Sequence, residues 1–207
     1  RNDVTQYGLF MTMLKNMYRL TKPGITRMNL VTVTIGFFLG GLGVFYPYKG
    51  YIALLIGTWC VASGAGMLNS YLERDLDSKM DRTKTRPLPL GLVSPKKALV
   101  CGVLLCICGL WMHYMYVNML TTILSFLTVF LYIMVYTPLK TITWLNTFIG
   151  SIPGALPVIG GWTASTGEIG FMAWVLFGMM YLWQHPHFYA IAWMCRKDYA
   201  EANLKML

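Results

Sequence analysis

Six long apolar stretches, separated by shorter polar segments, dominate the hydrophobic pattern of this chain. The hydrocarbon layer of a bilayer is about 30 Å thick, and a helix crosses it in about 20 residues. Inside a bilayer a helix also satisfies its own backbone groups, so helices are the expected form. The stretches cover residues 28–46, 51–69, 98–116, 119–136, 144–162 and 169–190. The pattern therefore predicts an all-α, polytopic transmembrane bundle with about six spans.

Two further features concern the N-terminal segment and the last two spans. Residues 1–27 are expected to form an amphipathic surface segment, because Met13, Met17 and Leu20 recur at helical spacing. Prolines at positions 153, 157 and 186 predict kinks or half-helices in the last two spans. No repeat or low-complexity tract divides the chain, so we expect a single domain over residues 1–207.

The composition supports a membrane protein. Only 12% of the 207 residues are charged and 56% are hydrophobic, whereas soluble domains have about 25% charged residues. This excludes a disordered chain, a coiled coil and almost any soluble globule. If the N-terminus is placed on one side of the membrane, every Lys and Arg except Lys49 falls on that side. The positive-inside rule makes that side the cytoplasm or the mitochondrial matrix. Topology thus explains the net charge of +9 without nucleic acid, although the charge also suits an anionic ligand.

Acidic residues crowd into the segment that follows the second span. Asn69, Glu73, Asp77 and Asp81 are four residues apart, which places them on one broad face if the helix continues. Like charges at this spacing repel each other unless a cation lies between them, and acids at a membrane boundary are functional candidates. Oxygen ligands of this kind suit Mg²⁺. The alternative is a solvated face with local ion pairs, such as Asp81 with Lys84.

Basic residues follow the acids at once. Arg82, Lys84 and Arg86 provide three cations within five positions. Arg binds phosphate oxygens through a bidentate fork, and Lys binds them as a point charge. Acids for a metal next to bases for phosphate form the arrangement that a metal–diphosphate complex requires.

These motifs resemble a known family. Asn69-x3-Glu73-x3-Asp77, followed by Arg82-Thr83 and Arg86-Pro87-Leu88, resembles the first acidic signature of the UbiA-type intramembrane prenyltransferase superfamily, and most closely its heme-farnesylating branch. Other stretches resemble the same branch, namely Lys22-Pro23, Tyr136–Lys140, Gly150–Pro157, Trp183–Phe188 and Asp198-Tyr199. Members of the branch have about nine spans, so we expect this chain to be truncated at its C-terminus.

The resemblance implies a bundle around a central cavity that opens to lipid. It also implies Mg²⁺-dependent transfer of a farnesyl group from farnesyl diphosphate to a vinyl group of heme b, giving heme O for heme–copper oxidases. The diphosphate would leave, the vinyl group would attack the allylic cation, and water would quench the resulting cation as a hydroxyl. Two acidic signatures would face each other above the cavity.

The resemblance also assigns roles to residues. The catalytic set is Asn69, Glu73, Asp77, Arg86 and Asp198, and the first three of these would hold the metal. The substrate-binding set is Arg82, Lys84, Arg196, Lys197, Tyr199 and His187. His187 is either a heme contact, to iron or to a propionate, or a hydrogen-bonding partner of a neighbouring helix. Tyr199 either orients substrate or anchors the end of its helix.

Two departures from the branch concern the second signature. Ala202 stands where the superfamily has a second Asp, which leaves the number of metal ions open. Asn203 replaces the usual Gly, and this predicts a left-handed backbone conformation, which Asn tolerates.

Three other functions remain open at this point. One is a polyprenyltransferase for an aromatic or quinone precursor, and the others are a membrane transporter and a non-catalytic assembly subunit. Expected partners, besides the lipid bilayer, are a heme A synthase or oxidase assembly factors. No imported presequence is visible, which favours a bacterial inner membrane over the mitochondrial inner membrane.

Overall fold

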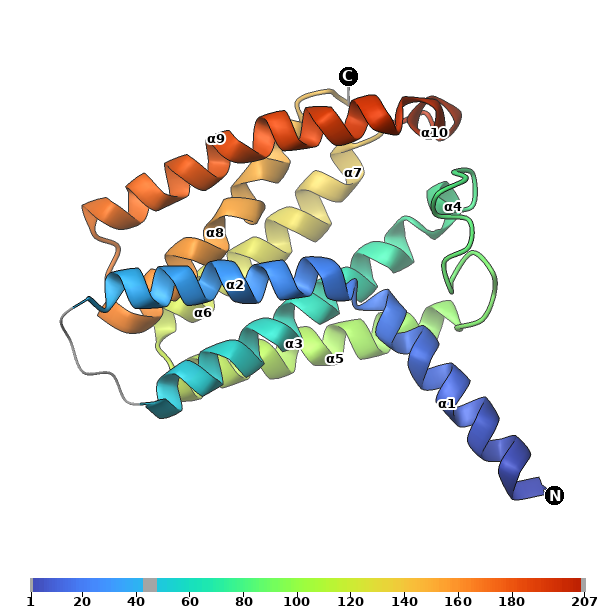
Figure 1. Ribbon diagram of the computed structural model, residues 1–207, viewed down its shortest axis with the longest axis horizontal. Coiled ribbons are helices and arrows are strands. Elements are labelled where there is room, and N and C mark those ends of the chain that lie inside the picture. The colour runs from blue at the N-terminus through green and yellow to red at the C-terminus, as the bar shows by residue number, and fades with distance from the viewer. Residues whose placement is uncertain (1, 43–47, 206–207) are drawn as a thin grey trace.

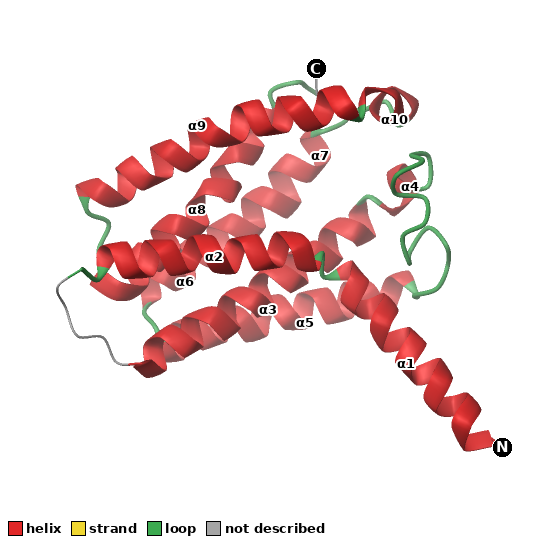
Figure 2. Ribbon diagram, viewed as in Figure 1, coloured by secondary structure: helices red, strands yellow, loops and turns green. Residues whose placement is uncertain are grey.

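The computed structural model describes residues 2–42 and 48–205, and this part of the chain is helical with no strand (Figure 2). Each of the six predicted spans is a helix, although residues 43–46 of the first span lie outside the described residues. The spans are α2 (Pro23–Gly40), α3 (Tyr48–Leu72), α5 (Pro95–Tyr116), α6 (Met119–Phe130), α8 (Asn146–Thr166) and α9 (Phe171–Met194). The predicted all-α bundle is therefore confirmed.

The outer surface of the bundle is suited to lipid. Within the described residues, three helical segments are long and apolar enough to cross a membrane, namely Gly50–Leu72, Pro95–Tyr116 and Met119–Leu139. On α5, large apolar side chains such as Val100, Leu104 and Ile107 are exposed. Helices α2 and α8 pack against these segments and contribute many of the buried glycine and threonine residues, and α9 packs on α8 (Figure 1).

Glycines bring the helix backbones into direct contact. A Cβ atom added at Gly64 of α3 would lie 2.6 Å from the carbonyl oxygen of Gly102 on α5. A Cβ atom at Gly161 of α8 would lie 2.0 Å from the carbonyl oxygen of Val33 on α2. Small residues permit this approach in membrane bundles, where the energy comes from packing. The glycines fix the spacing of α2, α3, α5 and α8.

The fourth span contains a π-helical segment. Helix α6 continues into η1 (Leu131–Tyr136) and then into the single turn α7 (Thr137–Leu139). In η1 the backbone N–H of Thr137 donates to the carbonyl of Tyr132, five residues earlier. The Thr137 hydroxyl donates to the same carbonyl at 2.8 Å. Short π segments inside α-helices often accompany functional sites.

The proline-containing helices are not divided. Helix α8 runs through Pro153 and Pro157, and α9 runs through Pro186. Of the predicted kinks or half-helices, the half-helices are therefore wrong, and the kinks stay a prediction. Each proline removes one backbone hydrogen bond. Packing of α8 against α2, α6 and α9 holds the helix together across that gap.

The N-terminal helix α1 (Asn2–Leu20) projects away from the bundle, as Figure 1 shows. Its last residue, Leu20, is 1% exposed and packs in a cluster with Met67 and Leu88. Earlier apolar side chains of the helix, including Met11 and Met13, are exposed. Only the end of α1 is therefore anchored in the bundle.

The predicted extension of the second span is wrong beyond Leu72. Helix α3 ends there, the short α4 (Arg74–Asp77) follows, and a series of turns leads to α5. Asp81 lies in one of these turns and pairs with Lys84 at 2.5 Å, both side chains being exposed. The turns bury Met80 and Val93, which a straight helix leaving the membrane would expose. Asn69, Glu73 and Asp77 remain buried together at the end of the bundle.

Candidate functional site

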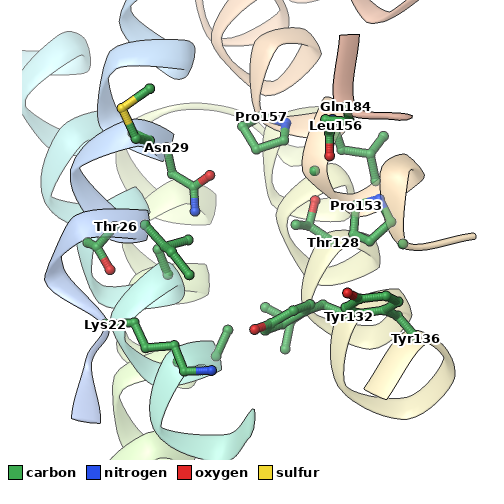
Figure 3. Close-up of a pocket in the computed structure, with 18 of the residues that line it drawn as sticks. Lys22, Thr26, Asn29, Thr128, Tyr132, Tyr136, Pro153, Leu156, Pro157 and Gln184 are labelled. Carbon is green, nitrogen blue, oxygen red and sulfur yellow. The ribbon is translucent and has the colours of Figure 1, made fainter. Parts of the chain in front are cut away.

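A cavity of about 620 Å³ lies in the bundle and is walled by α2, α3, α6, η1, α8 and α9. Figure 3 shows Lys22 and Asn29 on one wall, facing Tyr132 and Tyr136 on the other. One end of the cavity is lined by charged side chains, and the rest of its wall is mainly apolar. We call the first part the charged end and the second part the deep half.

Lys22 enters the charged end from the junction of α1 and α2. Its backbone has φ 51° and ψ 61°, a left-handed conformation that is uncommon for Lys, and Pro23 starts α2 directly afterwards. The ammonium group donates to the side-chain oxygen of Asn69, and the Asn69 amide nitrogen donates to Thr137 at 3.0 Å. Burial lowers the pKa of Lys22 to about 8, although the nearby Glu73 carboxylate favours the charged form.

Glu73 forms a buried ion pair. Its carboxylate accepts a hydrogen bond from Lys140 at 2.5 Å, and Lys140 also lies over the Tyr136 ring, 4.5 Å from its centroid. Burial alone would raise the pKa of Glu73, but the charges of Lys140 and Lys22 outweigh it and lower the pKa to about 2. Burial opposes the charge of Lys140 as well, and the surrounding Tyr136 and Glu73 nevertheless raise its pKa. Both groups are therefore charged.

Asp77 forms the second buried ion pair. Its side chain is 1% exposed, and both carboxylate oxygens accept from one guanidinium nitrogen of Arg86, at 2.8 and 2.7 Å. The hydroxyl of Thr83 donates to the Asp77 backbone carbonyl at 2.9 Å, which ties the loop to α4. The loop from Ser78 to Arg86 thus folds back, so that Arg86 at its end pairs with Asp77, the acid directly before the loop.

The two polar signatures meet at this end. The backbone N–H of Arg82 donates to Asp198 at 3.2 Å, which joins the first loop to α10 (Arg196–Glu201). Asn203 has φ 53°, so the predicted left-handed position is confirmed. Beyond it, the backbone N–H of Lys205 donates to the carbonyl of Lys140 at 2.8 Å. The Arg82–Asp198 contact brings the two signatures together at one end of the bundle, and the facing of their acids above the cavity stays a prediction.

The structure divides the predicted site residues into two groups. Those that line the cavity are Glu73, Asp77, Arg82, Arg86, His187 and Tyr199. Those outside its lining are Asn69, Lys84, Arg196, Lys197 and Asp198. Asn69 is fully buried behind the wall and holds Lys22, whereas Lys84 is turned away to Asp81. Arg196 lies over the Trp193 ring at 5.1 Å.

Two of the predicted residues that line the cavity come from the C-terminal helices, His187 from α9 and Tyr199 from α10. His187 stacks on Trp183, with ring centroids 4.9 Å apart and an interplanar angle of 14°. This leaves His187 exposed at the cavity wall, and no hydrogen bond joins it to another helix in the described part of the chain. Tyr199 is half-buried, and burial raises its pKa. Its hydroxyl therefore stays protonated.

Sequence reasoning missed several lining residues, of which four lie next to the predicted charged groups. They are Lys22, Tyr132, Tyr136 and Lys140. In the sequence both lysines indicate only topology, and the motifs Lys22-Pro23 and Tyr136–Lys140 only a resemblance. The signal that could have found them is a Lys at the very end of an apolar span, since such a residue must either reach outward to the interface or pair inward.

The charged end can accept an anion together with a divalent cation. Its lining has two acids, Glu73 and Asp77, and four bases, Lys22, Arg82, Arg86 and Lys140. Within residues 2–42 and 48–205, no group of three or more His, Cys, Asp or Glu side chains could hold a metal ion by itself. Two carboxylates still fit Mg²⁺, which commonly binds through one or two carboxylates plus the phosphates of its substrate.

The deep half is a neutral chamber. Leu54, Val61, Leu124 and Leu156 line it. Polar side chains interrupt the apolar wall on several helices, among them Asn29 of α2, Thr128 of α6 and Gln184 of α9, and Figure 3 shows these three around the same space. The deep half can hold an apolar chain whose anionic head is at the charged end.

Comparisons with known proteins agree with this geometry. A model of the UbiA prenyltransferase family matches residues 29–207. A protoheme IX farnesyltransferase of Solibacter usitatus is 41% identical over 202 residues, covering 94% of this chain and 69% of the relative. A protoheme IX farnesyltransferase of Opitutus terrae is 41% identical over 189 residues, covering 91% of this chain and 63% of the relative.

A solved structure shares the fold. A UbiA homologue from Archaeoglobus fulgidus, bound to GPP and Mg²⁺, superposes with a TM-score of 0.74 at 17% identity. The match covers 92% of this chain and 67% of that protein. This chain therefore spans about two thirds of the length of the proteins that it matches, from 63% to 69%.

Proposed function

Because this chain belongs to the UbiA prenyltransferase family, whose members are integral membrane proteins, we propose that it transfers a farnesyl group from farnesyl diphosphate to a vinyl group of heme b, giving heme O. The acceptor and the donor are proposed from relatives named protoheme IX farnesyltransferase, which are 41% identical to this chain. We place the charged end at the cytoplasmic or matrix face, because the basic residues gather there. A bacterial inner membrane is the favoured location.

The observation that carries the proposal is the union of two environments in one cavity. Four bases and two acids lie at one end, and a neutral, mainly apolar chamber continues from it. A prenyl diphosphate has the same division between an anionic head and an apolar tail. The charged end would bind the head, while the deep half would bind the tail and the acceptor.

Glu73 and Asp77 are the residues that would hold Mg²⁺, since both are buried and both line the cavity. Asn69 lies behind them and would position this pair through Lys22. When bound, Mg²⁺ would offset the charge of the diphosphate as it leaves. Each acid already pairs with a protein cation, Asp77 with Arg86 and Glu73 with Lys140. If a metal ion took the place of these cations beside the acids, the cations would turn to the phosphate.

The bases would act on the leaving group. Lys22, Arg86 and Lys140 are held by Asn69, Asp77 and Glu73 around one space. Preorganised cations that face a developing negative charge stabilise the transition state by several kcal/mol. Arg82 lines the same space, and Tyr199 adds a neutral hydroxyl donor. Asp198 would position Arg82 through its backbone N–H.

The deep half would protect the allylic cation from premature hydrolysis. Its leucine and valine side chains exclude bulk water, and an excluded site strengthens the interactions within it. His187 is stacked on Trp183 at the wall and would contact a flat aromatic acceptor. Lys84, Arg196 and Lys197 would contribute only at longer range. A heme A synthase or oxidase assembly factors would receive the product.

The test uses membranes that contain the protein. They are incubated with heme b, farnesyl diphosphate and Mg²⁺, and heme O is sought by mass spectrometry. Chelation of divalent ions should stop the reaction and added Mg²⁺ should restore it. A parallel reaction supplies an aromatic quinone precursor as the acceptor. Formation of the prenylated precursor without heme O would favour the related polyprenyltransferase, and no prenyl transfer at all would contradict the proposal.

A further inference from the structure

Several polar side chains in the deep half have no role in the proposed binding of the prenyl diphosphate, and Figure 3 shows three of them around one space. They are Asn29, Thr128 and Gln184, which come from three helices and line the cavity. Their neighbours at this level include Pro153, Leu156 and Pro157, as Figure 3 shows. We call these three residues the polar belt. The belt lies away from the charged end, because Asn29 is seven residues beyond Lys22, which is about 10 Å along α2.

Asn29 is the exposed donor of the belt. Its amide points into the cavity in Figure 3 and has no hydrogen-bond partner in the described part of the chain. The Asn29 side chain is half-buried, so its amide faces the open space of the cavity rather than the packed interior. A ligand or a water molecule in the cavity can therefore hydrogen-bond to it.

Gln184 is the fixed acceptor. Its side-chain nitrogen donates to the carbonyls of Ser151 and Met180, at 3.3 and 3.2 Å. These bonds use both of its protons and leave the side-chain oxygen with free lone pairs. Gly154 holds that oxygen in place, since an added Cβ there would lie 2.0 Å from it. Only a glycine permits this position of the amide.

Thr128 is a second acceptor. Its hydroxyl proton is donated to the Leu124 carbonyl at 2.8 Å, so the oxygen can only accept from a molecule in the cavity. The belt therefore offers two acceptors and one amide donor. A water molecule in protein interiors typically makes two to four hydrogen bonds, and this set can supply about three. Charged groups such as propionates would instead be attracted to the bases of the charged end.

We propose that Asn29, Thr128 and Gln184 hold the water molecule that adds to the acceptor after prenyl transfer. The inference rests on the proposed function. In that reaction the allylic C–O bond breaks and its electron pair leaves with diphosphate. The vinyl π electrons form the new C–C bond and leave a cation on the adjacent carbon. Water donates an electron pair to this carbon, and its proton passes to the released diphosphate.

The belt would thus determine the product rather than the rate of prenyl transfer. If no ordered water is present, the same cation loses a proton from carbon and gives an alkene. That product is lighter than the hydroxylated one by one water. The ratio of the two products is a readout that a merely structural role for these residues would not change.

The test measures this ratio in membranes supplied with heme b, farnesyl diphosphate, Mg²⁺ and ¹⁸O-labelled water. Asn29→Leu and Thr128→Val should each raise the ratio of alkene to hydroxylated product about tenfold, the effect of losing one hydrogen bond to the reacting water. Asn29→Ser keeps a polar group with room for water and should restore the hydroxylated product. Thr122→Val is the matched control. Its hydroxyl also donates within α6, to Asn118 at 2.9 Å, but it does not line the cavity.

The outcomes test the water-binding inference and the proposed function separately. Labelled hydroxylated product in the wild type, together with altered ratios in the belt variants only, supports the inference. An unchanged ratio of alkene to hydroxylated product in every active variant would overturn the inference and leave the proposed function intact. This holds also for a variant whose KM for heme is raised. If Asn29→Leu is inactive, Thr128→Val decides. Absence of any farnesylated heme in the wild type would overturn both proposals.

Discussion

The two ends of the cavity are held in place by different kinds of contact. At the charged end, Lys22, Arg86 and Lys140 each hydrogen-bond to the side chain of another residue, and two of these contacts are buried ion pairs. Around the deep half, glycines let the helix backbones touch: Gly36 of α2 lies against the Val158 backbone of α8, and Gly161 of α8 lies against the Val33 backbone of α2. Ion pairs can exchange partners when a ligand arrives, whereas backbone contacts cannot shift without separating the helices. We therefore expect the charged end to respond to ligand and the deep half to stay fixed.

Replacing an acid of the charged end should produce the largest effect. Asp77→Asn removes a buried charge that faces Arg86 and lines the cavity. We expect turnover to fall by about 10²–10³-fold or more, as when a preorganised electrostatic group is lost. Heme O formation measures this, and circular dichroism in detergent checks that the protein is folded. Asp81→Asn, in an exposed pair of the same loop, should remain active; equal losses in both variants would contradict the assignment.

Separating the buried pair Glu73–Lys140 should mainly lower stability. Lys140→Met leaves the Glu73 carboxylate buried without its partner, and such changes cost about 3–5 kcal/mol. Adding Glu73→Gln removes the stranded charge, so the double variant should recover much of the stability but remain inactive. Unfolding in mixed micelles gives the free energies. A double variant that is no more stable than Lys140→Met would show that the pair is not coupled.

Adding one methyl group to a glycine should distinguish the tight backbone contacts around the deep half from positions that have free space. Gly161→Ala forces a Cβ atom toward the Val33 carbonyl, and overpacking of this kind costs about 1–3 kcal/mol. The adjacent Gly160 has nothing within 4 Å of an added Cβ, so Gly160→Ala should be neutral or slightly stabilising. The thermal midpoint of each purified variant measures the difference. Equal midpoints would mean that α2 can move away from α8 easily.

The smallest effect should come from replacing Lys84, a base that belongs to the sequence motif but does not line the cavity. Lys84→Ala should change the KM for farnesyl diphosphate by less than about twofold, because Lys84 is exposed and paired with Asp81. Arg86→Ala, two residues further on, should raise the KM much more, since Arg86 lines the cavity. Steady-state kinetics on both variants test this. Similar values for the two would place the diphosphate nearer the loop surface.

The six spans could be predicted because each is a long apolar run, and length and hydropathy are properties of local sequence. The end of α3 could not, because spacing by four describes a face but contains no stop signal after Leu72. The site was only half predictable for a related reason. Asp77 and Arg86 are close in sequence, but Lys22 and Lys140 reach their partners across 47 and 67 residues. Such distant pairs leave no local pattern.

The π-helical segment Leu131–Tyr136 determines whether one wall of the cavity can serve both ends. Thr128 and Lys140 line the same cavity although they are twelve residues apart, and a regular α-helix would rotate them about 120° away from each other. The wider turn of η1 takes up this rotation, so the hydroxyl, the two tyrosine rings and the ammonium group form one continuous stripe. The register of this segment should therefore matter as much as its side chains, because the deletion of a single residue there would turn Lys140 out of the stripe.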